Sequence, residues 1–296
     1  MTDRSDRWVA EYREQGYLVV ERLFDQATVA RLIEEGTAVC RGQRGPVDGL
    51  EPVGPGESDA EVLARYQVCP MAHKASALYR ETMADPRLTR VLTRLIGPNV
   101  KAVHSQLYLK HAGMPGNAWH QDEMFIPTRD RSLLTAWIAL DPATIDNGCL
   151  KMLPGSHRSG VLWPMRRHRN PELDREEESY GFPEDPGSAT AVPLEPGSVV
   201  FFNGYLLHSS YPNRLQRGFR RSLLFVYVSA ETPMHWHPTD FRQANALSDW
   251  RDIVLVAGKD PYAWKGLADA GRAYVRKPGA TRNDRDRAEV AEKAAS

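Results

Sequence analysis

The residues best suited to chemistry are His120 and Asp122, which stand two positions apart in the segment Trp119-His120-Gln121-Asp122. In an extended strand, residues two apart point to the same face, so the imidazole and the carboxylate would converge on one metal ion. A helical zinc site needs histidines four apart, and no HExxH motif occurs in the chain. Because the chain has nine histidines, this triplet alone is weak evidence for a metal site.

A third candidate ligand, His208, follows a hydrophobic segment, residues 198–207, that leaves a Pro-Gly turn. Two histidines and one carboxylate on one face of a β scaffold form the facial triad of non-haem Fe(II) oxygenases, which leaves positions open for a co-substrate and O₂. The alternative is a loop histidine that hydrogen-bonds to the backbone. Taken together, the three residues predict an iron site at His120, Asp122 and His208.

A basic segment after the third ligand predicts an anion site. Arg220 and Ser222 share one face of a predicted strand, which we expect to lie beside the strand of His208. A guanidinium binds a carboxylate through two parallel hydrogen bonds, and a hydroxyl can add a third. The distal carboxylate of 2-oxoglutarate would supply the anion that a buried arginine requires. Both faces of this strand are otherwise hydrophobic, so Arg221 is an alternative anchor.

These side chains must be positioned by a helical N-terminal part and a β-rich remainder. Helices are predicted for residues 5–15, from the N-cap Asp25 onward, and between Asp85-Pro86 and Gly97-Pro98. The Gly- and Pro-rich segment 42–58 is predicted to be a loop. Short hydrophobic segments separated by Gly/Pro turns predict an all-β sandwich or barrel. The predicted strands are residues 17–20, 100–109, 133–140, 149–153, 198–203 and 222–229.

We expect a single domain over residues 1–296, with a mostly helical N-terminal part at residues 1–98 and a β core at residues 99–230. Within the core, the charged and Pro-rich segment 160–195 interrupts the strand pattern. It is too long for a hairpin turn and is expected to form a lid-like excursion over one mouth of the barrel, where binding loops tend to lie. Residues 231–296 are expected to form a C-terminal helical extension with a polar tail.

Composition and charge narrow the classes of function. Lys plus Arg and Asp plus Glu both number 38, so the net charge is zero, whereas a nucleic-acid-binding protein usually shows a basic excess. The N-terminus is polar, and no segment approaches the roughly 18 apolar residues of a membrane helix. The three cysteines suit neither a disulfide framework nor a CxxC site. We expect a cytoplasmic monomer or homodimer that binds neither nucleic acid nor membrane.

Six segments, taken in order, resemble the phytanoyl-CoA dioxygenase family. They are residues 119–122, 135–140, 147–150, 153–157, 196–202 and 208–213. The resemblance implies a mainly β fold, a double-stranded β-helix (jelly roll, cupin-like) with flanking N-terminal and C-terminal α-helices. It implies iron at the three ligands and favours Arg220, with Ser222, as the 2-oxoglutarate anchor. Gln106, Gln121 and Trp137 fall where relatives line the co-substrate pocket. The spacing before Arg220 is one residue longer than in some relatives, which keeps the neighbouring arginine open as an alternative.

The function that this resemblance implies is an Fe(II)- and 2-oxoglutarate-dependent dioxygenase. Such an enzyme uses 2-oxoglutarate and O₂, releases succinate and CO₂, and hydroxylates or otherwise oxidises an unactivated C–H bond of a small-molecule metabolite. Asp122 favours hydroxylation or another oxidative step over halogenation, because related halogenases lack this carboxylate. One alternative is a cupin-like metal-dependent hydrolase or isomerase, which would have no use for Arg220 with Ser222. The other is a non-catalytic binding protein on the same fold, which would be expected to lose a ligand.

Three further motifs have structural interpretations. His157, in the segment Leu-Pro-Gly-Ser-His, is predicted to lie in a turn that shapes the pocket rim. His235 and His237 lack a third partner at a plausible spacing and are predicted to pack near the surface. The basic run at residues 166–169 either faces an anionic substrate group or forms a solvated surface that the acidic residues 174–178 balance.

Overall fold

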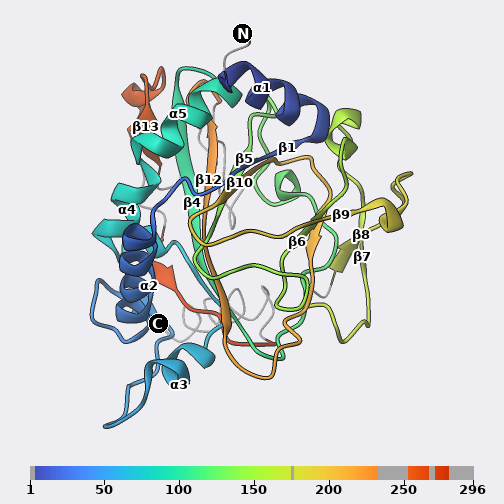
Figure 1. Ribbon diagram of the computed structural model, residues 1–296. Helices are drawn as coiled ribbons and strands as arrows, with labels where there is room; N and C mark the ends of the chain where they lie inside the picture. The colour runs from blue at the N-terminus through green and yellow to red at the C-terminus, as the bar shows by residue number, and fades with distance from the viewer. Residues whose placement is uncertain (1–3, 175–176, 233–252, 267–270, 280–296) are drawn as a thin grey trace, which may run out of the picture.

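A seven-stranded antiparallel sheet, here called the main sheet, forms the centre of the computed structural model (Figure 1). Its strands, in spatial order, are β1 (Tyr17–Val20), β10 (Val199–Asn203), β5 (Leu134–Ala139), β12 (Phe219–Ser229), β4 (Val100–His111) and β13 (Val254–Ala257), with β3 (Val68–Pro70) pairing with another part of β4. The structure describes residues 4–174, 177–232, 253–266 and 271–279. The strands predicted at residues 17–20, 100–109, 133–140, 198–203 and 222–229 are confirmed, and β12 starts three residues earlier than predicted.

A smaller antiparallel sheet faces the main sheet. Its strands, in spatial order, are β11 (His208–Ser210), β6 (Leu150–Met152) and β9 (Thr190–Val192). Trp137 and Phe202 of the main sheet pack with Met152 and Val192 of the smaller one in a buried hydrophobic cluster. Successive side chains of a strand point to opposite faces, so every second residue of each strand reaches this cluster. This pair of facing sheets confirms the predicted mainly β jelly roll.

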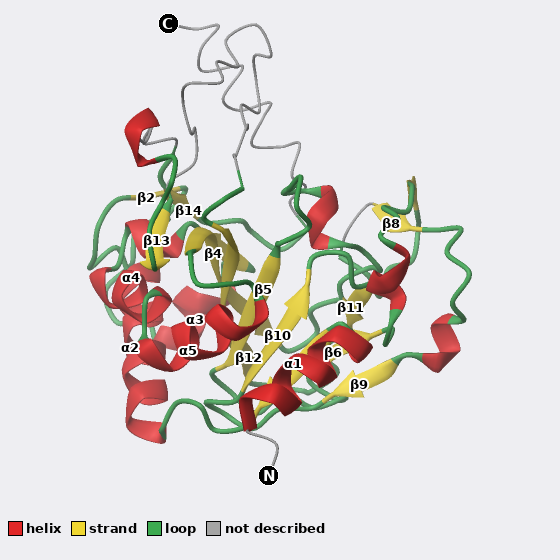
Figure 2. Ribbon diagram, turned by 90° about the horizontal axis from the view of Figure 1, so that it is seen from above, coloured by secondary structure: helices red, strands yellow, loops and turns green. Residues whose placement is uncertain are grey.

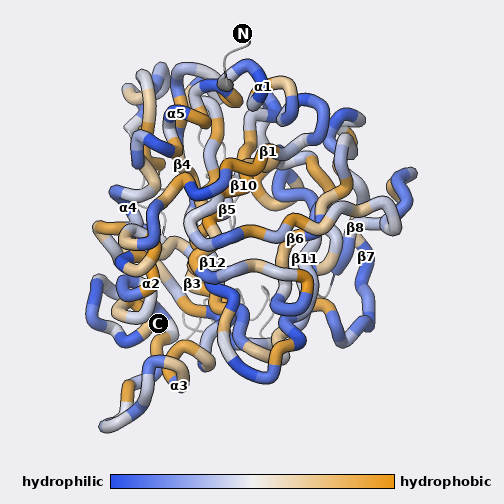
Figure 3. Tube along the Cα trace, in the orientation of Figure 1, coloured by the Kyte–Doolittle hydropathy of each residue, from blue (hydrophilic) through white to orange (hydrophobic). Residues whose placement is uncertain are grey.

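Helices cover the other face of the main sheet (Figure 2). They are α2 (Gln26–Cys40), α3 (Asp59–Ala64), α4 (Ala77–Met83) and α5 (Pro86–Leu95), whereas α1 (Arg4–Gln15) lies to one side of them in Figure 2 and packs against β1 and α5. Leu32 of α2, Tyr79 of α4 and Leu88 of α5 join Phe201 and Phe225 of the sheet in the larger hydrophobic cluster. The strands at the centre carry hydrophobic colouring in Figure 3, whereas the outlying loops are hydrophilic. The main sheet is thus buried on both faces, which explains its nearly continuous hydrophobic sequences.

The predicted helix starts are confirmed. The Asp25 carboxylate accepts a hydrogen bond from the Thr28 amide at 2.7 Å, and the Asp85 carboxylate accepts one from the Arg87 amide at 2.8 Å. Helices α3 and α4 were not predicted. With six and seven residues, they are too short for a hydrophobic period to stand out. The capping box at Ser58 was the available signal for α3.

The excursion differs from the predicted segment 160–195 at its end. It contains a hairpin of β7 (Met165–Arg167) and β8 (Glu177–Ser179), but residues 190–192 form β9 and belong to the smaller sheet. Strand β9 pairs with β6, which satisfies the backbone groups of both strands. Three residues are too few for an alternating pattern, so the sequence could not separate this strand from the excursion.

The prediction of a helical extension at residues 231–296 is wrong for the described residues of that part. They form β13, a short 3₁₀ turn at Ala263–Lys265, and β14 (Ala273–Tyr274), with no α-helix among them. Strand β13 pairs with the exposed edge of β4, and β14 pairs in parallel with β2 (Val47–Asp48). An unpaired strand edge offers free backbone groups, so pairing competes successfully with helix formation here. The remainder of this predicted extension lies outside the described residues.

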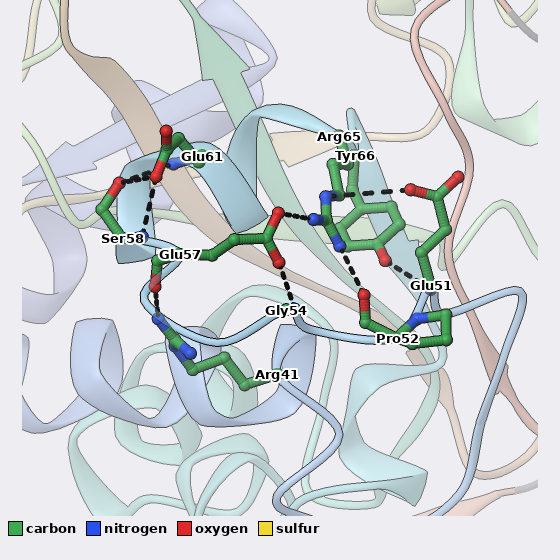
Figure 4. Close-up of polar contacts among 9 residues, drawn as sticks. All are labelled: Arg41, Glu51, Pro52, Gly54, Glu57, Ser58, Glu61, Arg65 and Tyr66. Carbon is green, nitrogen blue, oxygen red and sulfur yellow. Dashed lines mark hydrogen bonds and ion pairs between the residues drawn. The ribbon is translucent and has the colours of Figure 1, made fainter.

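Charged side chains fasten the Gly- and Pro-rich segment 42–58 (Figure 4). Arg65, at the end of α3, forms an ion pair with Glu57 and donates a hydrogen bond to the Pro52 carbonyl at 3.1 Å. Glu57 also accepts a hydrogen bond from the Gly54 amide. The segment is a loop, as predicted, apart from the two residues of β2. Ion pairs and hydrogen bonds, several of them to the flanking Arg65, fix its conformation in place of regular secondary structure.

We expect Gly197→Ala to lower the free energy of unfolding by about 2–3 kcal/mol. Gly197 has φ +83°, and a Cβ built there would lie 2.1 Å from the Phe24 carbonyl oxygen, so both backbone strain and a clash oppose alanine. Gly181→Ala is the matched control, because Gly181 has φ +76° with no atom within 4 Å of its Cβ position. Urea unfolding measures both. An equal loss in the two variants would contradict the importance of the Gly197–Phe24 contact.

Candidate active site

The three predicted ligands converge at one point between the two sheets. One ligand atom from each of His120, Asp122 and His208 lies within 4.8 Å of the others. The Nε2 atoms of both histidines lie 3.7 Å from the Asp122 Oδ1. The backbones of His120 and His208 exchange hydrogen bonds of 3.0 and 3.1 Å, which fixes the two rings side by side. Asp122 begins the 3₁₀ helix η2 (Asp122–Met124), which turns its carboxylate back toward them.

Backbone carbonyls set the orientation of both imidazole rings. The Nδ1 of His120 lies 2.8 Å from the Ala118 carbonyl oxygen, and the Nδ1 of His208 lies 2.9 Å from the Leu206 carbonyl oxygen. A carbonyl only accepts, so each Nδ1 carries a proton, and in the neutral ring the lone pair is then on the Nε2 that faces Asp122. This is the arrangement that metal-binding histidines adopt. Two neutral imidazoles and one carboxylate therefore fit a divalent iron.

Asp122 is itself held in place by a neighbouring hydroxyl. Thr135, on β5, donates a hydrogen bond of 2.7 Å to the Asp122 Oδ2, which leaves Oδ1 facing the two histidines. Thr135 is fully buried, whereas the Asp122 side chain retains 17% exposure. The main sheet thus orients the carboxylate that the segment 119–122 supplies.

We expect Thr135→Val to weaken Fe(II) binding by about tenfold, the lower range for loss of an outer partner of a metal ligand. Valine keeps the shape of the side chain but removes the hydrogen bond to Asp122. Anaerobic titration with Fe(II) measures the affinity. Thr93→Val, at a half-buried helical position, makes the same chemical change outside the site and should leave the affinity unchanged. Equal affinities in all three proteins would show that the hydroxyl does not support the metal ligand.

Strand β12, which carries Arg220, lies in the sheet opposite the strand of His208 and not beside that strand. The turn at residues 204–207 carries the chain from β10 across to the smaller sheet, so His208 begins β11, which pairs with β6. Strand β12 pairs instead with β4 and β5 of the main sheet. The prediction that the two strands are neighbours is therefore wrong. Both side chains nevertheless border the interior between the two sheets, because Arg220 contacts the Trp137 ring and His208 contacts the Phe202 ring of the same hydrophobic cluster.

Cross-strand register places most of the predicted co-substrate residues on one face. Ser222 lies opposite Ala139, and Leu224 lies opposite both Trp137 and Gln106. Opposite residues in an antiparallel pair share a face. Thr135, which contacts Asp122, belongs to the same face of β5 as Trp137. The inner face of the main sheet therefore runs from the metal ligands to Arg220.

Arg220 has the environment of an anion-binding residue. Its side chain is 3% exposed, its Nη1 donates a hydrogen bond of 2.8 Å to the Ser222 hydroxyl, and its guanidinium lies 5.1 Å from the Trp137 ring centroid. Its Nε is buried and has no hydrogen-bond partner in the described part of the chain. Burial lowers the pKa of Arg220 to about 10, so the group is still charged at neutral pH. A buried, incompletely bonded guanidinium fits the distal carboxylate of 2-oxoglutarate.

The alternative anchor, Arg221, points to the other side of β12. Its Nε and Nη2 donate hydrogen bonds of 2.8 and 2.7 Å to the two carboxylate oxygens of Asp141. The guanidinium is therefore already bonded to a carboxylate on both arms. This pairing supports Arg220 as the anchor and gives Arg221 a structural role.

Gln121 is placed differently from the predicted co-substrate contact. The side chain is fully buried, and its amide nitrogen donates to the Val161 and Tyr205 carbonyls at 2.9 and 2.8 Å. Its amide oxygen accepts a hydrogen bond from the Trp163 amide at 2.8 Å. These bonds use both N–H groups, so Gln121 ties the start of the excursion to the metal motif. Gln106, by contrast, is half-buried on the inner face.

Ser210, which the sequence analysis missed, belongs to the same interior. Its hydroxyl accepts hydrogen bonds from Lys110 Nζ at 3.0 Å and from the Asn117 amide at 2.9 Å. A hydroxyl has two acceptor sites and one proton, so the proton of Ser210 is left to donate to a third atom. The signal was its position two residues after His208 on a short strand, which gives both side chains the same face.

The other motifs have mainly structural contacts. The Nε2 of His157 lies 3.1 Å from the Arg13 carbonyl, so this histidine ties a 3₁₀ turn to α1, and is not placed with the metal ligands. Within the basic run, Arg166 forms an ion pair of 2.9 Å with Glu178 across the β7–β8 hairpin. That pairing supports the interpretation as a solvated surface. His235 and His237 lie outside the described residues.

Known proteins share this combination of fold and residues. A family model described as "Phytanoyl-CoA dioxygenase (PhyH)" matches residues 12–222, which is more than half of the chain and includes His120, Asp122, His208, Arg220 and Ser222. The chain belongs to the phytanoyl-CoA dioxygenase family. As a family member, it is a 2-oxoglutarate-dependent non-haem iron dioxygenase, with iron as the cofactor and 2-oxoglutarate and O₂ as co-substrates.

Curated relatives of this chain are named for different substrates. The human peroxisomal phytanoyl-CoA dioxygenase is 26% identical over 266 residues, which cover 84% of this chain and 74% of that protein. A probable alpha-ketoglutarate-dependent hypophosphite dioxygenase of Stutzerimonas stutzeri is 25% identical over 226 residues, covering 75% and 77%. Membership of the family therefore fixes the reaction class and leaves the substrate open.

A solved structure supports the fold. The epimerase SnoN, in complex with Fe3+, alpha ketoglutarate and nogalamycin RO, has a TM-score of 0.60 at 22% identity, over 92% of this chain and 98% of that one. The likeness confirms the jelly-roll fold. Within the described ranges, no helix is long and apolar enough to span a membrane.

Proposed function

We propose that this oxygenase hydroxylates an unactivated C–H bond of a small-molecule metabolite, with iron held by His120, Asp122 and His208. The observation that carries the proposal is the combination of a two-histidine, one-carboxylate cluster with a buried, incompletely bonded arginine on the same inner surface. A cupin-like hydrolase or isomerase would explain the cluster but not Arg220. A binding protein without catalysis would have no need for three oriented ligands.

The residues of this chain bind and orient, while the bound group supplies the chemistry. Iron with 2-oxoglutarate and O₂ provides the oxidising power for C–H hydroxylation and yields succinate and CO₂. The imidazoles of His120 and His208, held by carbonyls, present their Nε2 atoms, and Asp122 presents one carboxylate oxygen. Arg220, Ser222 and Trp137 would hold the distal end of the co-substrate. Hydrophobic residues of both sheets line the interior beside the ligands, which would limit the access of water to the site.

Turnover of the co-substrate tests this function directly. We expect the purified protein with Fe(II), ascorbate and O₂ to convert 2-oxoglutarate to succinate, slowly in the absence of a prime substrate. A chelator should stop the reaction, and Fe(II) added in excess should restore it, because the ligands are side chains of the folded protein. Succinate formation is measured by chromatography. Undiminished succinate formation after complete removal of iron would contradict the proposal.

We also propose one domain over the whole chain and a cytoplasmic location, as a monomer or homodimer. The support for one domain is the main sheet, which joins β1 near the N-terminus to β13 at residues 254–257. The support for a reducing compartment is that Cys40, Cys69 and Cys149 are buried free thiols. Size-exclusion chromatography with light scattering measures the oligomeric state, and fractionation of cells measures the location.

A further inference from the structure

Lys110 is a buried lysine next to the proposed anchor for the co-substrate. It lies on β4 directly opposite Arg220 of β12, and it is 5% exposed. Opposite residues share a face, so Lys110 points into the same interior as Arg220 and Ser222. A lysine is rarely buried to this extent without a partner of opposite charge. Burial of the Lys110 amine therefore costs free energy of folding, which suggests a role at the site.

The contacts of Lys110 are all with neutral groups. Its Nζ donates hydrogen bonds to the Ser210 hydroxyl at 3.0 Å and to the Tyr211 carbonyl at 2.8 Å. No carboxylate within the described ranges forms an ion pair with it. Burial, and then the neighbouring Arg220, lower the pKa of Lys110 well below its usual value, while Asp174 opposes the shift. A buried amine beside a buried guanidinium favours binding of an anion, because the anion would stabilise the charged form of the lysine.

The lysine also connects the two sheets. It extends from β4 of the main sheet to Ser210, the last residue of β11 in the smaller sheet, two positions after His208. A Cβ at Gly148 would lie 2.7 Å from the Lys110 Cδ, so the side chain is closely surrounded. Its hydrogen bond occupies one acceptor site of Ser210, and the Asn117 amide occupies the other. Lys110 therefore forces the Ser210 hydroxyl to act as a donor.

We propose that Lys110 is a positioning residue for the co-substrate: it orients the Ser210 hydroxyl as a hydrogen-bond donor and, protonated when the anion binds, adds a second positive charge beside Arg220 for the distal carboxylate of a 2-oxo dicarboxylate. This inference rests on the proposed function and deepens it. The orienting part does not depend on the charge, because a neutral amine keeps two N–H donors for Ser210 and Tyr211. The electrostatic part makes the pocket selective for a co-substrate with a carboxylate at its far end.

Binding of two co-substrate analogues tests the inference. 2-Oxoglutarate and 2-oxopentanoate share the 2-oxo acid end and the five-carbon chain, but only the first carries a distal carboxylate. Calorimetric titration into the Mn(II)-loaded protein under argon measures both affinities without turnover. In Lys110→Met, we expect 2-oxoglutarate to bind at least about tenfold more weakly, the effect of losing one charge-assisted contact. The affinity for 2-oxopentanoate should change less than about twofold.

The difference between the two analogues separates positioning of the carboxylate from a general structural effect. A loss of affinity for both compounds by the same factor, or for neither, would overturn the inference. Lys110→Gln, measured in the same way, keeps an N–H donor without the charge and serves if the methionine variant does not fold. Lys151→Met is the matched control. Lys151 Nζ also lies near Tyr211, 4.9 Å from its ring centroid, but Leu150 and Met152 face the core, so Lys151 between them points to the other side of the strand. It should retain the wild-type preference.

The same titrations distinguish a failure of the proposed function from a failure of the role of Lys110 alone. If the wild-type protein binds neither compound, the co-substrate assignment falls, and the role of Lys110 falls with it. If the wild-type protein prefers 2-oxoglutarate and Lys110→Met keeps that preference, only the role of Lys110 is overturned.

Discussion

Replacing Asp122 with alanine will lower the rate at which 2-oxoglutarate is converted to succinate by more than about a hundredfold. Removing an outer partner of a metal ligand already costs up to about a hundredfold, and Asp122 is a ligand itself. The reason is that Asp122 is the sole carboxylate of the three-residue cluster, and its Oδ1 lies 3.7 Å from both histidine Nε2 atoms. Two neutral imidazoles alone bind Fe(II) weakly, because the anionic ligand supplies much of the attraction for a hard cation. Succinate formation and Fe(II) affinity should fall together.

A surface carboxylate provides the control for this variant. Glu172 forms an exposed ion pair with Arg214 at 2.9 Å, so Glu172→Ala removes a carboxylate but no group at the metal site. Exposed ion pairs contribute little to stability. We expect wild-type turnover from Glu172→Ala and a folded, inactive protein from Asp122→Ala, with circular dichroism to check the fold. Wild-type turnover by Asp122→Ala would remove the basis for an iron site at this cluster.

Arg220→Ala will raise the Michaelis constant for 2-oxoglutarate by roughly 100-fold, equivalent to two charge-assisted hydrogen bonds. The guanidinium is 3% exposed, and its Nε has no partner in the described part of the structure, so a carboxylate can complete its hydrogen bonding. The value of kcat at saturating co-substrate should change much less, because Arg220 would contact the end of the molecule that does not react. Steady-state kinetics with varied 2-oxoglutarate measures both constants.

Arg221→Ala is the internal control, because the same residue type is removed one position away. Arg221 is paired through two hydrogen bonds with Asp141, and their side chains are 22% and 15% exposed. Breaking this pair should lower the free energy of unfolding by about 1–2 kcal/mol and leave the Michaelis constant within about twofold of wild type. If Arg221→Ala raised the Michaelis constant and Arg220→Ala did not, the two arginines would exchange roles.

The sequence carried most of the information on strands and helix starts. Alternating or continuous hydrophobic segments identified β1, β4, β5, β6, β10 and β12, and Asp25 and Asp85 identified two helix starts by their capping chemistry. These signals are local, because burial on one face and hydrogen bonding of a helix end depend on nearby residues. The short elements α3, α4 and β9 escaped, since six, seven and three residues hold too few periods of any pattern.

The strand neighbours of the site required the tertiary structure. Nothing in the sequence shows that the turn at residues 204–207 carries His208 to the smaller sheet, so the expected neighbour of β12 was wrong. Strand pairing brings together residues far apart in the chain, and its register is set by packing of the whole sheet. The same pairing placed β13 and β14 in a part that the sequence suggested to be helical. Long-range contacts decided these features.

By itself, the sequence determined which residue types could bind the metal: His120, Asp122 and His208, with a basic anchor near residue 220. Residue type and spacing carry that information, because ligand chemistry depends on the side chain and residues two apart in a strand share one face. Only the tertiary structure separated the two arginines, since Arg220 turns inward beside Trp137 while Arg221 meets Asp141. It also brought Lys110 and Ser210 to the same interior. Both outcomes depend on facing sheets and cross-strand register, which a linear pattern does not encode.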